Sequence, residues 1–128
     1  MVNKKKFRVV IAGSRGFNDY DLLKEKCNEF LIEKRKNYDV IVVSGGARGA
    51  DKTGEEYAKN EGFLVEVYLA DWDKYGKKAG FIRNCQMGEV ADALIAFWDG
   101  ESHGTKHMID YCTKKGLNVK IVKYKNIK

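Results

Sequence analysis

The sequence contains no proline and only three cysteines, Cys27, Cys85 and Cys112, none of them in a CxxC pair. Each cysteine falls on an apolar position of an expected helix, which predicts buried free thiols in a reducing compartment and excludes a disulfide framework. No apolar run approaches the roughly 18 residues that span a bilayer. The sequence therefore predicts a cytoplasmic protein with no membrane partner.

Histidine is also scarce, because the chain has only His103 and His107. These two lie four residues apart, but no cysteine or acidic residue completes a recognisable ligand pattern around them. A structural zinc site needs four ligands that converge. We therefore expect no metal ion and no cofactor.

Basic residues outnumber acidic ones, 24 to 18, which gives a net charge of +6. The excess lies at the two ends: residues 1–8 carry four basic groups and no acid, and residues 113–128 carry six lysines and no acid. The segment between them, residues 9–112, holds the remaining 14 basic residues and all 18 acidic ones, so its net charge is negative. We expect solvated basic tails at 1–6 and 124–128, with only a diffuse attraction to nucleic acid.

A length of 128 residues with 44% apolar content predicts one domain, residues 1–128. Short apolar runs alternate with amphipathic segments along it. The expected strands are residues 7–12, 40–43, 63–69, 93–98 and 118–122, and the expected helices are residues 19–36, 51–60, 81–90 and 105–115. This alternation predicts a doubly wound, Rossmann-like α/β fold with a mostly parallel five-stranded sheet and helices on both faces.

Three loops that follow expected strands are rich in glycine: residues 13–16 (GSRG), 44–49 (SGGARG) and 100–104 (GESHG). In a strand order 3-2-1-4-5 they meet at one edge of the sheet. Each precedes a helix N-terminus, where unpaired amides and the helix dipole favour an anion. Three such loops predict a phosphate site, although none matches GxGxxG or the GxxxxGK[ST] loop.

Other polar and aromatic residues near these loops are candidates for the rest of a nucleotide. Arg15 and Arg48 are placed to pair with phosphate charge. Asp51 is expected to cap the second helix and to hold a ribose hydroxyl. Trp72 and Tyr75, in a polar connection, are candidates for stacking on a base.

The segments GSRGFNDY, VSGGARGAD, ADWDKYGKKAGFIRNCQM and ALIAFWDGESHGT together resemble the YspA-type branch of the SLOG superfamily. The resemblance covers nearly the whole chain. It implies a Rossmann-like domain that binds nucleotides or nucleotide-derived ligands, and a homodimer is common among relatives. Those relatives include LOG-type phosphoribohydrolases, the DNA-processing protein DprA, and sensor domains for ADP-ribose-derived signals.

The residue patterns and the resemblance together define the candidate ligand contacts. They are Gly13, Ser14, Arg15, Ser44, Gly45, Gly46, Ala47, Arg48, Gly49, Asp51, Trp72, Tyr75, Arg83, Asn84, Asp99, Gly104 and Thr105.

Two features bear on catalysis. Arg83 with Asn84 resembles the arginine element of LOG-type hydrolases, and Gly104-Thr105 matches part of their PGGxGTxxE motif. The Pro-Gly-Gly is missing, however, and His107 and Met108 stand where the acids would be.

We therefore predict a binding module, a sensor or sequestering protein for a nucleotide or a nucleotide-derived ligand, either an ADP-ribose-like molecule or a cyclic nucleotide signal. The first alternative is a LOG-type phosphoribohydrolase of nucleoside 5'-monophosphates with Arg83 as a catalytic residue. The second alternative is DprA-like binding of single-stranded DNA, which the acidic middle of the chain disfavours.

Overall fold

The computed structural model describes residues 4–125. Its five strands are β1 (Lys6–Gly13), β2 (Asp39–Ser44), β3 (Leu64–Val67), β4 (Ala93–Trp98) and β5 (Asn118–Lys123). Its helices are α1 (Tyr20–Leu31), α2 (Lys34–Asn37), α3 (Ala50–Glu61), α4 (Trp72–Tyr75), the 3₁₀ turn η1 (Gly76–Lys78), α5 (Ala79–Val90) and α6 (His103–Lys114).

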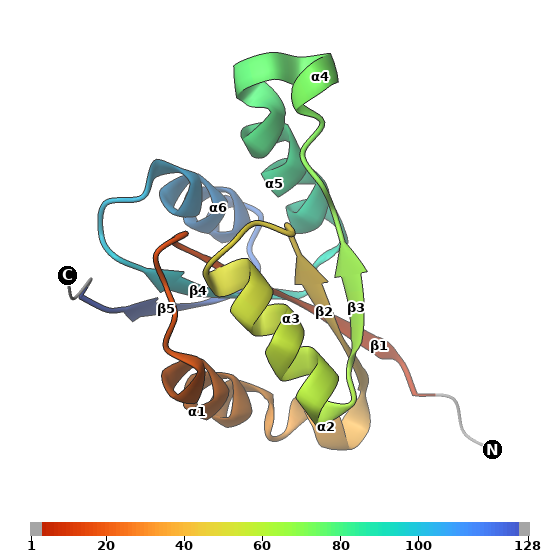
Figure 1. The fold of residues 1–128 in the computed structure, drawn as a ribbon. Coiled ribbons are helices and arrows are strands. Elements are labelled where there is room, and N and C mark those ends of the chain that lie inside the picture. The colour runs from red at the N-terminus through yellow and green to blue at the C-terminus, as the bar shows by residue number, and fades with distance from the viewer. Residues whose placement is uncertain (1–3, 126–128) are drawn as a thin grey trace.

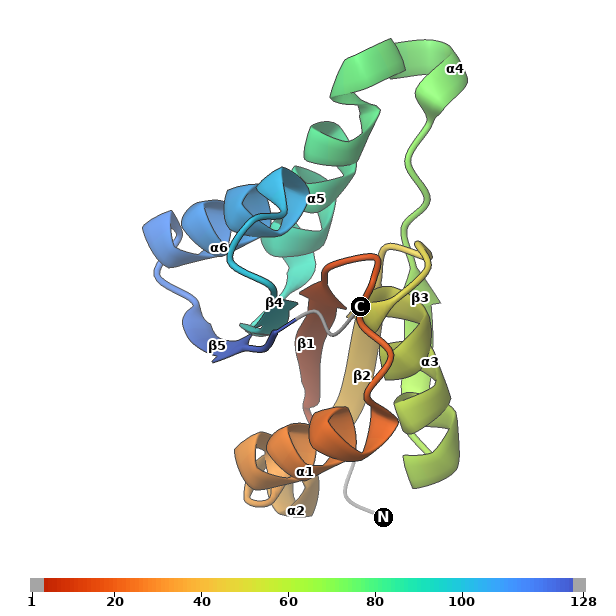
Figure 2. The same ribbon diagram turned by 60° about the vertical axis from the view of Figure 1, so that its left-hand side comes forward.

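The strands form one parallel sheet in the order β3-β2-β1-β4-β5 (Figure 1). Helices α1 and α3 cover one face, and α5 and α6 cover the other (Figure 2). This arrangement confirms the predicted Rossmann-like fold and the strand order that brings the three glycine loops together. Within the described residues no helix is long and apolar enough to cross a membrane.

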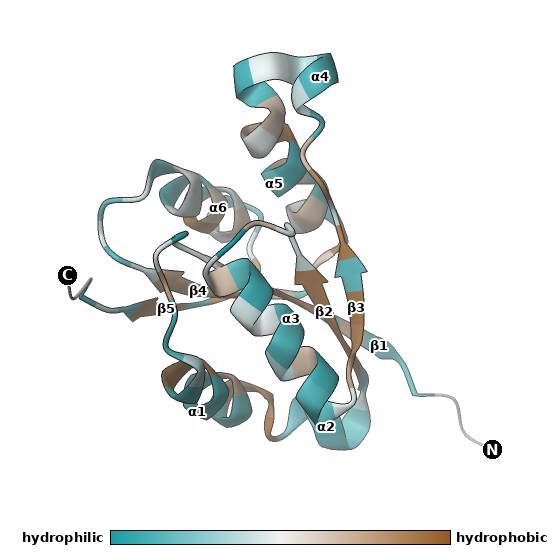
Figure 3. Ribbon diagram, in the orientation of Figure 1, coloured by the Kyte–Doolittle hydropathy of each residue, from teal (hydrophilic) through white to brown (hydrophobic). Residues whose placement is uncertain are grey.

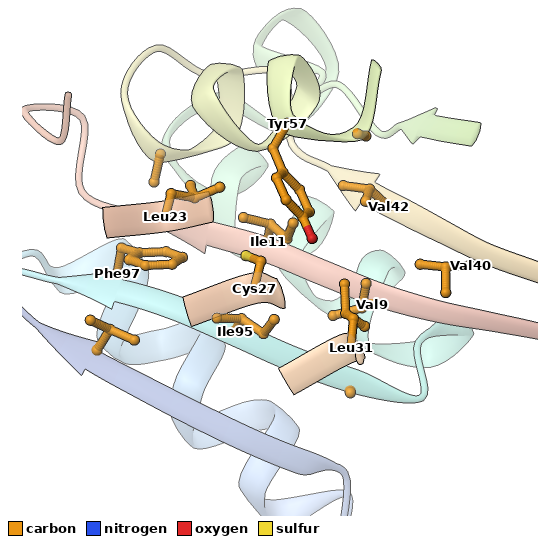
Figure 4. Close-up of a cluster of buried hydrophobic side chains, with 14 of the residues drawn as sticks. Val9, Ile11, Leu23, Cys27, Leu31, Val40, Val42, Tyr57, Ile95 and Phe97 are labelled. Carbon is orange, nitrogen blue, oxygen red and sulfur yellow. The ribbon is translucent and has the colours of Figure 1, made fainter. Parts of the chain in front are cut away.

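The alternation of side chains along β1 divides the core into two layers. Val9 and Ile11 join the cluster beneath α1 and α3, whereas Val10 and Ala12 join the cluster beneath α5 and α6. Figure 4 shows the first cluster, where the Tyr57 ring lies among aliphatic side chains. The strands are mainly apolar, and the polar residues of the helices lie largely on their outer sides (Figure 3). Burial on both faces explains why β1, β2 and β4 read as unbroken apolar runs.

The expected helix over residues 19–36 is wrong beyond Leu31, where the chain breaks into two helices. Asp19 caps α1, with its Oδ1 accepting from the Leu22 amide at 3.0 Å. The helix ends at Leu31, its last buried residue, and the separate helix α2 buries no side chain. A helix without a buried face gains little from packing, so the charged segment after Leu31 does not continue α1.

The expected strand over residues 63–69 is too long at both ends. Strand β3 lies at the sheet edge and pairs only with β2, whose last residue, Ser44, is the partner of Val67. Beyond Val67 there is no strand to pair with, and Phe63 instead packs against Tyr57, with ring centroids 6.1 Å apart.

Several helix starts also differ from the prediction. Helix α5 begins at Ala79 rather than residue 81, and the connection before it contains α4 and η1. Helix α6 begins at His103 rather than residue 105. Both differences lengthen the helices toward the carboxyl edge of the sheet.

Two side-chain predictions need correction. The N-cap of α3 is Gly49, not Asp51, whose side chain points back to the preceding loop. Cys27 and Cys112 are buried as expected, but Cys85, on α5, is only half-buried. All three are free thiols. Of the expected basic tails, residues 1–3 and 126–128 lie outside the described residues, and Lys6 already belongs to β1.

Candidate functional site

The three glycine loops meet at Ser14, which is buried at the end of β1. Its amide donates to the Phe97 carbonyl at 3.0 Å, and its hydroxyl accepts from the Asp99 amide at 3.2 Å. Its carbonyl accepts from the Ala50 amide at 3.3 Å. One serine therefore ties the loop after β1 to the loops after β4 and β2.

Gly49 allows two of these loops to touch. Its φ is +83°, and a Cβ there would lie 2.4 Å from the Ser14 carbonyl oxygen and 2.5 Å from that of Arg15. A side chain at this position would meet rigid backbone in a conformation that L-residues avoid. The loop sequence thus needs glycine at this point for packing as well as for turning.

A pocket with two lobes opens above the joined loops. The helix-side lobe has a volume of 240 Å³ and lies between α5, α6 and the loop after β1. The loop-side lobe has a volume of 470 Å³ and lies over the loop after β2. Both lobes are lined by Arg15, Ala47, Trp72 and Arg83, so these four residues form the boundary between them.

Arg83 reaches from α5 to the loop after β2. Its Nη1 donates to the Gly45 carbonyl at 2.6 Å, and its Nε donates to the Asn84 Oδ1 at 3.3 Å. Burial lowers the pKa of Arg83, and the nearby Asp51 carboxylate partly opposes that effect. Nη2 has no acceptor among residues 4–125, which leaves it as a donor toward the pocket.

Asp51 is the one acidic side chain lining the pocket in the described part of the chain. It is only 6% exposed, and its Oδ2 accepts from the Ala47 amide at 3.2 Å. Burial raises its pKa to about 6, against the opposing effects of that amide and of Arg83. Its Oδ1 is left as an acceptor for a hydroxyl group.

The N-terminus of α6 forms part of the wall of the helix-side lobe, which Asp51 also lines. Ser102 caps the helix by accepting from the Thr105 amide, and a Cβ on Gly104 would meet nothing within 4 Å. The first turn of α6 is therefore accessible, as an anion site requires. Across the two lobes four cationic side chains, those of Arg15, Arg48, Lys77 and Arg83, face the single carboxyl of Asp51.

The structure brings twelve of the seventeen candidate residues to the pocket wall. They are Gly13, Arg15, Gly45, Gly46, Ala47, Arg48, Asp51, Trp72, Arg83, Asn84, Gly104 and Thr105. Asn84 is also held by hydrogen bonds to neighbouring groups, which leaves its amide little capacity for a ligand.

The other five candidates lie near the pocket without lining it. Ser14 joins the loops, and Gly49 packs against it. Ser44 is buried and donates to Glu55 at 2.6 Å. Asp99 accepts from the amides of Glu101 and Ser102 in the turn before α6, and the Tyr75 ring lies beneath the Lys74 ammonium, 5.1 Å away.

Sequence reasoning missed the apolar floor of the helix-side lobe, which is formed by Phe81, Met87 and Met108, and the cation of Lys77. Phe81 lies two residues before Arg83 and is 45% exposed, unusual for an aromatic residue on a helix that packs against a sheet. In residues 4–125 no three His, Cys, Asp or Glu side chains are grouped to hold a metal ion.

Solved structures share this fold. DNA processing protein A (DprA) from Streptococcus pneumoniae superposes with a TM-score of 0.66 at 18% identity, over 91% of this chain and 50% of the DprA chain, so this chain spans half of that length. The protein TM1055 superposes with a TM-score of 0.61 at 22% identity, over 90% of this chain and 72% of its own. At these identities the likeness is one of fold.

Sequence comparison identifies the family. The Gene 61 protein of Mycobacterium phage D29 is 41% identical over 118 residues, which cover 88% of this chain and 93% of the phage protein. The model of the YspA, cpYpsA-related SLOG family matches residues 7–75, which include β1, β2, β3 and the loops after β1 and β2. The chain therefore belongs to the YspA, cpYpsA-related SLOG family.

Proposed function

We propose that the protein binds a nucleotide-derived ligand, of which an ADP-ribose-like molecule is the best match, and acts as a sensor or sequestering module. Membership of the SLOG family implies a nucleotide-related ligand. The observation that carries the finer proposal is the two-lobed pocket, in which four cations and a helix N-terminus surround one buried carboxyl.

The phosphates belong at the boundary of the two lobes. Arg15 and Arg83 line both lobes, so an anion placed between them would contact two guanidinium groups at once. Arginine binds phosphate oxygens through two parallel hydrogen bonds, and partial burial strengthens each of them. An excess of three positive charges suits a diphosphate better than a single phosphodiester.

The remaining groups of the ligand follow from the chemistry of each lobe. Asp51 presents an acceptor for a ribose hydroxyl in the helix-side lobe. Trp72 is 53% exposed and presents a ring on which a base can stack. Two lobes on either side of the arginines favour a ligand with a group attached at each end of its phosphates.

The first test is isothermal titration calorimetry with AMP, ADP, NAD and ADP-ribose. We expect ADP-ribose to bind more tightly than AMP, because only the larger ligand reaches both lobes. Arg15→Ala should weaken every ligand by about tenfold or more, since it removes a charge-assisted hydrogen bond. Arg48→Ala should weaken ADP-ribose more than AMP, because Arg48 lines only the loop-side lobe.

Arg35→Ala is the matched control for loss of charge. Arg35 pairs with Glu61 at 2.7 Å at the opposite end of the sheet, so its removal should leave ligand affinity unchanged. Equal losses from Arg35→Ala and Arg15→Ala would mean that the net charge, and not the pocket, attracts the ligand. Absence of binding by all four compounds would contradict the proposal.

Hydrolysis of the N-glycosidic bond is a second candidate function, and one observation favours it. A buried carboxyl whose pKa is raised to about 6 lies close to Arg83 inside the pocket. Such a group can exchange a proton near neutral pH, as general acid or base catalysis requires. Water would then add across the bond between ribose and base, with Asp51 moving the proton.

Mass spectrometry of protein mixed with each compound separates the two functions. Intact ligand that stays with the protein and is released by heat is the expected result for a binding module. Free base together with the remaining phosphate-containing fragment, which is ribose 5-phosphate in the case of AMP, would identify a hydrolase, and Asp51→Asn and Arg83→Ala should then abolish product formation.

We also propose a homodimer. Strand β3 is a sheet edge, and Leu64 and Val67 on it are 68% and 47% exposed, with Leu69 just beyond at 72%. Exposed apolar side chains on an edge strand favour association. Light scattering should give twice the mass of 14.6 kDa, and Leu64→Lys together with Leu69→Lys should return a monomer.

A further inference from the structure

His107 lies outside the pocket wall, yet it is joined to Arg83 through Asn84. Asn84 is 7% exposed, and its side-chain oxygen and NH₂ group make three polar contacts. Its Oδ1 accepts from Arg83 Nε at 3.3 Å, and its Nδ2 donates to the Gly104 carbonyl at 3.1 Å. The same Nδ2 lies 3.3 Å from Nδ1 of His107.

These contacts determine the tautomer of His107. A reversed Asn84 amide would place its NH₂ against the Arg83 Nε–H and its oxygen against the Gly104 carbonyl, so only the observed orientation satisfies both neighbours. Nδ2 then donates toward the histidine, and Nδ1 must accept. Neutral His107 therefore carries its proton on Nε2.

We propose that Asn84 is a positioning residue for Arg83, and that protonation of His107 frees the Nε of Arg83 from Asn84 and weakens anion binding in the pocket. A proton on Nδ1 would turn the contact with Asn84 into one between two donors. The amide must then rotate or withdraw, and either movement breaks its bond to Arg83 Nε. The inference on affinity rests on the proposed function, whereas the coupling between the three side chains does not.

The packing around His107 favours the neutral ring. Its ring lies 4.5 Å from that of Phe81 and 6.4 Å from that of Tyr111. Burial lowers the pKa of His107, and Asp110 on the same helix partly opposes this shift. The ring is thus neutral at pH 7 and takes up a proton only under more acidic conditions.

The other charged groups near His107 have their own partners. Lys106 pairs with Asp110 at 2.7 Å on α6, and Glu89 on α5 is held by Lys115 at 2.7 Å and by the Tyr111 hydroxyl. Cys85 lies on the same face of α5. The side of α6 toward the sheet carries Met108, Ile109 and Cys112, none of them charged at neutral pH.

The test follows Arg83 directly, without a ligand. In nitrogen-15 NMR spectra the Arg83 Nε–H signal, assigned by its loss in Arg83→Lys, is recorded between about pH 5 and about pH 7.5, together with the His107 ring carbon. Asp51 titrates in the same range and lies close to Arg83, so the experiment is carried out in Asp51→Asn protein. The Arg83 signal should shift with the same midpoint as the His107 ring.

Two variants give the expected contrast. Glutamine does not titrate, so His107→Gln should abolish the pH-dependent shift of Arg83. His103→Gln, at an exposed histidine on the same helix, should leave that shift unchanged. An Arg83 signal that does not change as His107 titrates overturns the proposal. This comparison of midpoints needs only the His107-containing protein, so it remains valid even if His107→Gln does not fold.

Affinity provides the second measurement. ADP-ribose is the probe, because its diphosphate does not change charge in this range of pH. In Asp51→Asn protein its dissociation constant should rise about tenfold from neutral to acidic pH, the size of one charge-assisted hydrogen bond. In the protein that also carries His107→Gln the rise should vanish. If ADP-ribose binds neither the Asp51→Asn protein nor the parent protein, the proposed ligand is wrong while the NMR test of the coupling still stands.

Discussion

At the scale of single residues, Asp51 stands out because burial disfavours the charged form of its carboxyl group. A carboxyl that is 6% exposed and has no ion pair within 4 Å among the described residues keeps its pKa near 6, against an ordinary value of 3.8. The folded protein therefore prefers the protonated form more than the unfolded chain does. Native proteins retain such unfavourable groups mainly at functional sites.

The pH dependence of stability tests this environment. Because the folded pKa is raised, the contribution of Asp51 is fully present below about pH 4 and is lost as the pH rises through about 6. Asp51→Asn removes the titration, so its stability relative to the parent should improve by up to about 3 kcal/mol from acidic to neutral pH. Urea denaturation of both proteins at several pH values measures the difference, and a constant difference would contradict the assignment.

A second prediction concerns Gly49. Gly49→Ala should destabilise the protein by about 3 kcal/mol or more, because the new Cβ meets two backbone carbonyls in addition to the cost of a positive φ. Gly62→Ala is the matched control, with φ +78° and nothing within 4 Å of its Cβ, and should cost about 1 kcal/mol. Similar midpoints of urea denaturation for the two variants would contradict the prediction, because they would mean that the backbone around residue 49 moves to accommodate the new Cβ at little cost in stability.

At the scale of elements, α4 carries the proposed base platform. Figure 1 shows α4 at the far end of α5, beyond the carboxyl ends of β2 and β3. Trp72 on α4 lines both lobes, whereas Tyr75 lines neither. The helix has only four residues and buries none of them, so little packing holds the Trp72 ring in place.

Substitutions on α4 should therefore differ in effect. Trp72→Ala should weaken ADP-ribose about tenfold or more, the usual size of stacking on one base, and Tyr75→Ala should have no effect. Ribose 5-phosphate has no base and should bind Trp72→Ala as it binds the parent. Calorimetry with the two ligands makes the comparison, and a loss that is equal for both would place the Trp72 ring elsewhere in the complex.

The elements also show how far the sequence leads. The apolar runs predict all five strands. Burial on both faces leaves the signal in nearly every residue of β1, β2 and β4, whereas the edge strands β3 and β5 keep apolar runs although most of their side chains are exposed or half-buried. The boundaries of β3 and of α1 depend on where a neighbouring strand stops and where a helix loses its buried face, and neither is visible in a single segment. The glycine loops likewise predict the edge of the sheet at which the pocket lies. Phe81, Met87 and Lys77 line the pocket because of the path that η1 and α5 take, and that path is not visible in the sequence.

At the scale of the whole molecule, the net charge of +6 attracts any polyanion, and the pocket must be distinguished from that background. Lys114, Lys120 and Lys125 are exposed, and none of the three lines either lobe. Changing these three to glutamine should reduce the salt dependence of oligothymidine binding by about 0.7 for each phosphate that is no longer neutralised. The dissociation constant for ADP-ribose should stay the same, and a parallel loss for both ligands would favour a single nucleic-acid surface.

The chain has two tryptophans, and the fold treats them differently. Trp98 is half-buried at the end of β4, where its Nε1 donates to the Ser102 carbonyl at 3.1 Å and the Lys123 ammonium lies 5.6 Å from its ring. Trp72 is about half exposed to solvent at the boundary of the two lobes. Replacing Trp98 with phenylalanine would leave one indole, so that ultraviolet emission alone would report occupancy of the pocket in real time. The protein thus contains its own optical sensor, with no attached dye.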